Sequence, residues 1–115
     1  GIEVETTVTP TESGHIRKHV IKSNIECIAY DCGFAVEIDV KGEALGAEKD
    51  SAFVKNDISS CTVKRLEGNG EGYVIIADPN TNILYPMTRI PSVLYTISKG
   101  ENVLMTEVMA YYEKK

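Results

Sequence analysis

Residues 67–82, EGNGEGYVIIADPNTN, begin with three closely spaced glycines and continue into a short apolar run. A dinucleotide-binding loop needs the spacing G-x-G-x-x-G between a strand and a helix, whose N-terminus holds the pyrophosphate. Here the spacing is G-x-G-x-G from Gly68 to Gly72, the next segment is strand-like, and glutamates that would repel a phosphate lie before and between the glycines. We therefore predict no phosphate site, but a hairpin turn with positive φ at Asn69 and Gly70.

The apolar run at residues 73–77 is followed by a second turn of different chemistry, D-P-N-T-N at residues 78–82. Proline at the second position of a turn and Asp or Asn around it are typical turn residues. The D-x-N-x-N spacing also resembles the start of a calcium loop, but Ile83 and Arg89 occupy the positions that need Gly and Glu. A short strand between two turns is the strongest indication of an all-β fold.

Other segments repeat this pattern of short strands separated by turns. The clearest is residues 34–41, where Phe34 and Val36 share one face with the next apolar residues and charged residues occupy the other. Residues 42–51 are predicted to be a polar loop or one helical turn. Pro86 and Pro91 indicate an edge strand or an irregular crossing. The remaining predicted strands are residues 2–8, 25–30, 52–55, 58–66 and 92–98, the last followed by a tight hairpin turn at residues 99–100.

Two segments fit a helix and a strand almost equally well. Residues 15–23 place Ile16, Val20 and Ile21 on one helical face, but the β-branched residues favour a strand. Residues 102–113 carry a helical stripe of apolar residues, whereas the sequence just before them is typical of a hairpin. We predict strands for both, which gives about eight or nine short strands in an antiparallel β-sandwich, Ig-like or jelly-roll-like, or a small barrel. If both are helices, the class becomes α+β.

Composition limits the class of protein. The chain has 115 residues, of which 43% are hydrophobic and 25% charged, as expected for a single globular domain over residues 1–115. The net charge is −5 and the basic residues are scattered, so we expect no nucleic-acid binding. No apolar run is long enough to span a bilayer. Because the chain starts with Gly1, we expect a processed end or a domain boundary there.

Cysteines and histidines supply the only candidates for reactive chemistry. Cys27, Cys32 and Cys61 could form one disulfide with one free thiol, or all three could be reduced, and they leave the compartment open, with a preference for an extracytoplasmic one. Cys27 and Cys32 are too far apart in sequence for a zinc knuckle. His15 and His19 lie among basic residues and are expected to be exposed. We therefore predict no metal, no cofactor and no catalytic set.

The function expected from these features is that of a non-enzymatic binding or structural module, which acts on a protein partner or on itself through loops or an edge strand. The candidate partner-facing residues are Gly68, Asn69, Gly70, Tyr111 and Tyr112. Adjacent tyrosines on a strand cannot both face inward, so one is expected at a surface.

Two alternatives stay open. One is a small thiol-dependent enzyme that uses Cys32 or Cys61 with His15 or His19 as the base. The other is a protease inhibitor that inserts the loop at residues 68–72 or 42–51.

Overall fold

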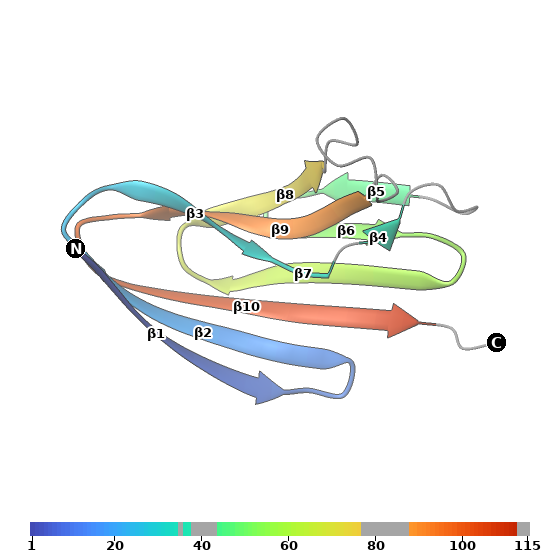
Figure 1. Cartoon of the computed structure of the whole chain (residues 1–115), viewed down its shortest axis with the longest axis horizontal. Coiled ribbons are helices and arrows are strands. Elements are labelled where there is room, and N and C mark those ends of the chain that lie inside the picture. The colour runs from blue at the N-terminus through green and yellow to red at the C-terminus, as the bar shows by residue number, and fades with distance from the viewer. Residues whose placement is uncertain (35, 38–43, 77–87, 113–115) are drawn as a thin grey trace.

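Antiparallel strands, and no helix, form the part of the chain that the computed structural model describes, residues 1–34, 36–37, 44–76 and 88–112 (Figure 1). The predicted all-β class is therefore confirmed. The strands are β1 (Ile2–Pro10), β2 (Gly14–Ser23), β3 (Cys27–Cys32), β4 (Val36–Glu37), β5 (Ala44–Ala47), β6 (Ser51–Lys55), β7 (Ser59–Glu67), β8 (Gly70–Ile76), β9 (Thr88–Ile97) and β10 (Gly100–Tyr112).

The strands form two antiparallel sheets. The larger sheet has the order β1-β2-β10-β7-β6-β5. In the smaller sheet β9 is central, with β8 on one side and β3 and β4, one after the other, on the opposite side. Since β2 and β10 pair over their whole common length, both ambiguous segments are strands and the α+β alternative is wrong.

The core lies between the sheets and is built from alternate residues of the facing strands. Tyr95 of β9 is fully buried, and its hydroxyl contacts Thr106 Oγ1 at 2.6 Å and donates to the carbonyl of Met105 at 3.0 Å. Burial raises the pKa of Tyr95, and the hydrogen bond with Thr106 opposes part of this increase. The apolar core residues are Ile21, Val36, Ala52, Val54, Cys61, Val63, Val93, Tyr95, Ile97, Leu104 and Val108.

The two long sides of the sandwich differ. On one side, β8 lies against the turn between β5 and β6, where the N–H of Gly72 donates to the carbonyl of Glu48 at 3.0 Å. A Cβ on Gly72 would overlap the backbone oxygen of Ser51, so only glycine permits this approach. On the other side, β3 contacts β2 through Arg17 and Asp31, β1 is the outermost strand of the larger sheet, and the two sheets diverge toward the end of β1 (Figure 1). The sandwich is therefore closed along β8 and open along β1.

The glycine turn at residues 68–70 differs from the prediction in two ways. β7 and β8 belong to different sheets, so the turn crosses the sandwich and is not a hairpin between paired strands. The residue with positive φ is Gly68, at 105°, and neither Asn69 nor Gly70 has a positive φ. The predicted hairpin at residues 99–100 is wrong for the same reason, because β9 and β10 also lie in different sheets. Local sequence shows a turn but not which sheet the next strand joins.

Pro91 lies in the central strand of the smaller sheet, which corrects the prediction of an edge strand or irregular crossing. β3 ends opposite Ser92 and β4 starts opposite Arg89, so the pairing on that side of β9 is interrupted at Pro91. The carbonyl of Pro91 accepts a hydrogen bond from the N–H of Gly33 at 2.8 Å. In a β-strand the N–H and the carbonyl of one residue point to the same side. The position where Pro91 lacks an N–H therefore faces the gap between β3 and β4, and the pairing with β8 on the other side loses no donor.

The segment at residues 42–51, predicted to be a loop, contains β5, which pairs with β6. Its small, weakly apolar residues, ALGA, gave no strand signal, and tertiary pairing decides the outcome. The turn predicted at residues 78–82, and most of the strand predicted at residues 34–41, lie outside the described residues.

Candidate functional site

β1 forms a long, exposed edge of the larger sheet. Its nine residues are all exposed, and one side pairs with β2 from Ile2 to Pro10. Among the described residues no strand pairs with its other side. We call this side, with its unpaired backbone, the open edge. A long edge of this kind presents a row of N–H and carbonyl groups that can accept another strand.

The side chains of β1 alternate strictly between two faces. On the face that points toward the space between the sheets, Val4 is 58% exposed and Val8 is 56% exposed. Val4 borders a small cavity that Ala29 and Tyr30 of β3 also line. That inward face carries Ile2, Val4, Thr6, Val8 and Pro10. The outward face carries Glu3, Glu5, Thr7 and Thr9. The open edge therefore joins free backbone to an uncovered apolar stripe.

The usual protections of an edge strand are missing from β1. Natural edges are shortened, bulged, or given lysines, internal prolines or inward-pointing charges. β1 pairs with β2 without a bulge, its only proline ends the strand at Pro10, and both of its charges, Glu3 and Glu5, point outward. The opposite edge of the same sheet, β5, has only four residues. The two edges thus differ in their capacity to take up a strand.

A polar cluster beside β1 fixes β2 against β3. Arg17 of β2 forms an ion pair with Asp31 of β3 at 2.8 Å and donates to the carbonyl of Cys32 at 2.7 Å. Arg17 Nε also donates to His15 Nε2 at 2.9 Å. Both charged side chains are mostly buried, so the pair holds the two sheets together where the apolar core ends. The prediction that His15 and His19 are exposed is wrong, because both are partly buried in this cluster.

His19 connects this cluster to the edge strand. Its Nε2 contacts Asp31 Oδ2 at 3.1 Å and its Nδ1 contacts Thr6 Oγ1 at 2.8 Å. An aligned Asp, His and hydroxyl is also the arrangement of a hydrolytic relay. Here Asp31 is already shared with Arg17, and the adjoining cavity has a volume of about 150 Å³, below the range of about 300–1,000 Å³ typical of ligand pockets. The contacts favour a role in holding β1 in place.

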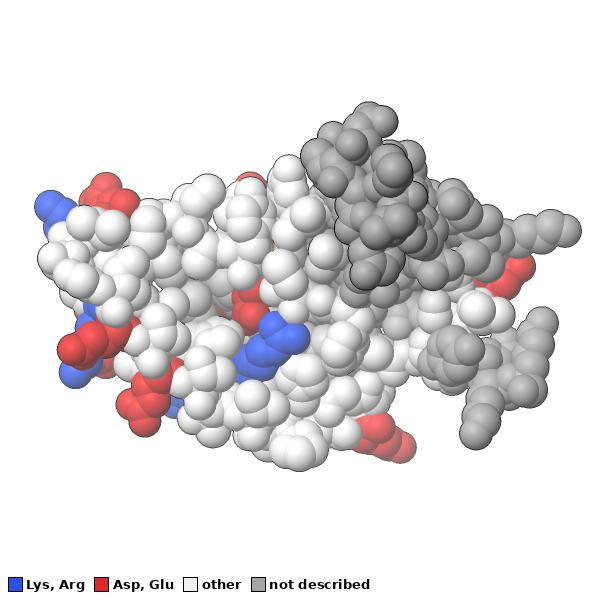
Figure 2. Space-filling view, in the orientation of Figure 1, with Lys and Arg blue, Asp and Glu red and all other residues white. Residues whose placement is uncertain are grey.

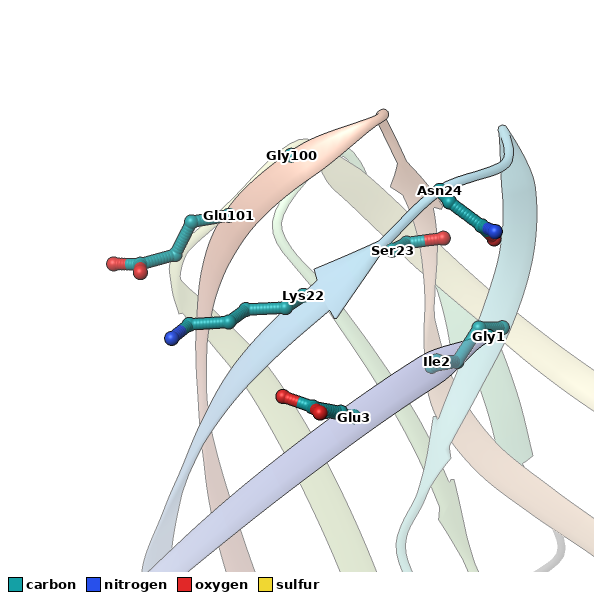
Figure 3. A pocket seen from close by; sticks show the side chains of 8 residues that line it. All are labelled: Gly1, Ile2, Glu3, Lys22, Ser23, Asn24, Gly100 and Glu101. Carbon is teal, nitrogen blue, oxygen red and sulfur yellow. The ribbon is translucent and has the colours of Figure 1, made fainter.

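A larger pocket, of about 480 Å³, lies at the start of β1 (Figure 3). Three charged side chains lie in a row beside it, with Lys22 of β2 between Glu3 of β1 and Glu101 of β10, as the pairing register requires. Cross-strand pairs of opposite charge of this kind stabilise a sheet by about 0.2–1 kcal/mol each. Lys22 therefore offsets part of the negative charge on the outward face of β1 near Glu3.

The cysteines are free thiols, and in the described part of the chain neither histidine hydrogen-bonds to any of them. The hydrogen bonds of His15 go to Arg17 and those of His19 go to Thr6 and Asp31. Burial raises the pKa of Cys61, and burial and then the charge of Asp31 raise the pKa of Cys32. Raised values disfavour the thiolate that a nucleophile needs.

The predicted partner-facing residues lie at two opposite ends of the molecule. β7 pairs with β10 so that Glu67, beside the glycine turn, lies near Met105, whereas Ser59 lies opposite Tyr112. Tyr111 is exposed, and Asn69 is exposed at the tip of the turn. Gly68 packs close to Tyr95 and Leu104, and Gly70 close to Leu94 and Tyr95, so neither is available as a free loop. The structure does not bring these residues together into one surface.

The sequence interpretation missed the open edge, although its signal was present. Residues 2–10 alternate in part and contain no lysine or arginine, which is the pattern of an unprotected edge. No signal indicated that Asp31 would meet Arg17 and His19, because the register between sheets cannot be read from either strand.

Comparisons with known proteins, and the distribution of charged and metal-binding residues, do not indicate a function for this chain. No family model matches the chain, and no curated protein or solved structure matches it significantly. In the described residues there is no helix long and apolar enough to cross a membrane, and no cluster of three or more His, Cys, Asp or Glu suited to a metal. Figure 2 shows acidic and basic side chains interspersed over one face of the described part, without a continuous patch of one sign.

Proposed function

We propose that this chain is a non-enzymatic binding or structural module that takes up an additional β-strand at the open edge of β1. The observation that carries the proposal is that β1 pairs with β2 alone among the described residues, while all nine of its residues are exposed. Strand addition uses main-chain hydrogen bonds for affinity and alternate side chains for specificity. β1 offers both, because its apolar stripe and its free backbone lie along the same nine residues.

The rigid backing of β1 supports this proposal. A strand that accepts a partner must be held in an extended form before the partner arrives, because ordering it on binding would weaken affinity. β1 is held by continuous pairing with β2 and by the bond from Thr6 to His19, which the Arg17–Asp31 pair fixes in turn. The edge is therefore ordered in advance.

Neither alternative function gains support from a specific contact. The thiol-dependent enzyme would need a cysteine with a lowered pKa beside a histidine, and the pKa values of Cys32 and Cys61 are raised. The loop-inserting inhibitor would need a projecting loop, but Ala44–Ala47 is a paired strand and Gly68 packs against the core.

A peptide titration tests the proposal. Two fluorescein-labelled peptides serve as probes: one has the sequence of β1, IEVETTVTP, and the other has the same composition with its glutamates moved to the later outward positions, ITVTTEVEP. We expect binding of the first peptide at least, measured by fluorescence anisotropy, and a loss of at least about tenfold in V4K, because an inward-pointing ammonium blocks an edge. The matched control is I28K, which places the same charge at an exposed residue of β3. The proposal fails if neither peptide binds, or if V4K binds as the wild type does.

A further inference from the structure

We infer that the strand taken up at the open edge is β1 of a second copy of this chain, paired antiparallel about a two-fold axis at Thr6. This inference rests on the proposed function and names its partner. Thr6 is the middle residue of Ile2–Pro10, so in this register each residue meets the one equally far from the centre on the other copy. Such an interface is isologous and closes as a dimer.

The apolar face of β1 is self-complementary in this register. Val4 of each copy lies opposite Val8 of the other, and Ile2 lies opposite Pro10. Both valines are more than half exposed in the single chain. Directly opposite apolar pairs on one sheet face are favourable contacts, so pairing joins the two exposed stripes into one row with the two Thr6 side chains at its centre.

The charges of β1 select the antiparallel arrangement. Both acids, Glu3 and Glu5, lie in the first half of the strand, and the two outward threonines, Thr7 and Thr9, lie in the second half. Antiparallel pairing about Thr6 sets each glutamate opposite a threonine. Parallel pairing in register would set each glutamate opposite its own copy, and like charges directly opposite each other are destabilising.

Lysines of β2 extend this charge match across the joint. Thr7 pairs with Lys18 within one copy, and it would face Glu5 of the other copy on its free side. The row across the interface then runs from Lys18 through Thr7 to the partner's acid, with no like charges adjacent. Glu3 is already flanked by Lys22. Although each chain carries a net charge of −5, this register places no two acidic residues directly opposite each other at the edge.

Cysteine cross-linking tests the register directly. Only Thr6 meets its own copy, at an expected Cα separation of about 4.5–5.5 Å, within the range that a disulfide spans. We expect T6C to form a disulfide-linked dimer under mild oxidation. V4C alone and V8C alone should not, but their mixture should form a linked heterodimer. The parent protein under the same oxidant controls for Cys27, Cys32 and Cys61.

A second measurement does not depend on the T6C variant, which loses the bond to His19. Thr9 pairs with Ile16 within one chain and would meet Glu3 across the joint. By sedimentation equilibrium we expect T9K to lower the dimer dissociation constant and T9E to raise it, each by about 2- to 30-fold for two symmetric pairs. Folding of each variant is checked by circular dichroism.

The outcomes separate this inference from the proposed function. A wild-type protein that stays monomeric at high concentration but binds either peptide keeps the strand-addition module and overturns the self-pairing. Oligomers that T6C does not cross-link and that T9K and T9E do not affect, such as filaments built through β5, also overturn it. Binding of the rearranged peptide as tightly as the β1 peptide contradicts the antiparallel register. If the chain neither associates nor binds a peptide, both proposals fail.

Discussion

Gly72 shows how a single residue determines the closed side of the sandwich. Its backbone lies against the turn between β5 and β6, where its N–H donates to Glu48. Gly100, by contrast, is glycine for its positive φ of 104° alone, because a Cβ there would meet nothing within 4 Å. Replacing Gly72 therefore measures the free-energy cost of backbone overlap, and replacing Gly100 measures the cost of a strained φ.

We expect G72A to destabilise the fold by about 3 kcal/mol, the upper end of the usual range for overpacking, since a methyl group would collide with the backbone at Ser51. G100A should cost only about 1 kcal/mol, the penalty for an alanine in a left-handed conformation. Urea denaturation gives both free energies of unfolding. Equal costs for the two variants would show that β8 does not approach the turn this closely.

Tyr95 provides a second test at the scale of one residue. Its hydroxyl is buried between Thr106 and the carbonyl of Met105. We expect Y95F to lower the free energy of unfolding by about 1–3 kcal/mol, because buried polar atoms of β10 lose their partner. Y73F is the matched control, since Tyr73 is 43% exposed and contacts Tyr30 only at the surface. A change in Y95F as small as in Y73F would contradict a hydroxyl bridge between the sheets.

At the scale of strands, the ion pair between Arg17 and Asp31 connects β2 to β3. We expect D31N to destabilise by about 1–3 kcal/mol, because the guanidinium of Arg17 keeps its mostly buried place without a counter-charge. The double variant R17M/D31L should recover most of that loss, since apolar side chains can replace a buried pair. Thermal and urea unfolding measure both. A double variant less stable than D31N would show that the pair itself, and not the avoidance of a lone charge, stabilises the contact.

The strands themselves could largely be predicted from sequence, because alternation and turn residues are local signals. Residues 92–98 and 58–66 carry both signals, and the strands expected at residues 15–23 and 102–113 are confirmed as β2 and β10. β2 was ambiguous because its inward face carries His15, Arg17 and His19 instead of apolar residues. Sheet membership could not be predicted, since a turn such as that at Gly68 has the same local sequence whether it joins neighbours or crosses between sheets. The polar cluster around Asp31 depends on that crossing, so it was not foreseen.

At the scale of the whole molecule, one side of the sandwich is sealed by backbone contacts and the other is left open at β1. A closed barrel has no edges, whereas in the described part of the chain the larger sheet ends in a long strand, β1, on one side and a short one, β5, on the other. Because β1 is longer and more exposed than β5, we expect association at β1 and not at β5. Addition of a strand at β1 would extend the larger sheet and cover its apolar stripe.

Stability of the whole fold should fall at alkaline pH. The folded state raises the pKa of Cys61 and Cys32 above the ordinary value of 9.0 and that of Tyr95 above 10.0. Above pH 9 the unfolded chain therefore releases protons that the folded chain retains, and the free energy of unfolding decreases by up to about 1.4 kcal/mol per pH unit for each group.

Urea titrations between pH 7 and pH 10.5 measure this decline. C61V removes one of the three groups while keeping an apolar core residue, so its profile should be flatter than that of the wild type. A wild-type stability that stays constant up to pH 10.5 would contradict the burial of these groups.

Residue-resolved amide hydrogen exchange along β1 tests the central claim most directly, because strand addition requires new hydrogen bonds to the edge-facing N–H groups. In dilute protein, alternate amides between Ile2 and Thr9 should exchange almost unprotected while their neighbours, bonded to β2, are protected. At high protein concentration, or with the β1 peptide at saturation, the unprotected set should slow by at least about tenfold, and the amides of β5 should not change. Association or peptide binding that leaves the edge-facing amides of β1 unprotected would contradict the account.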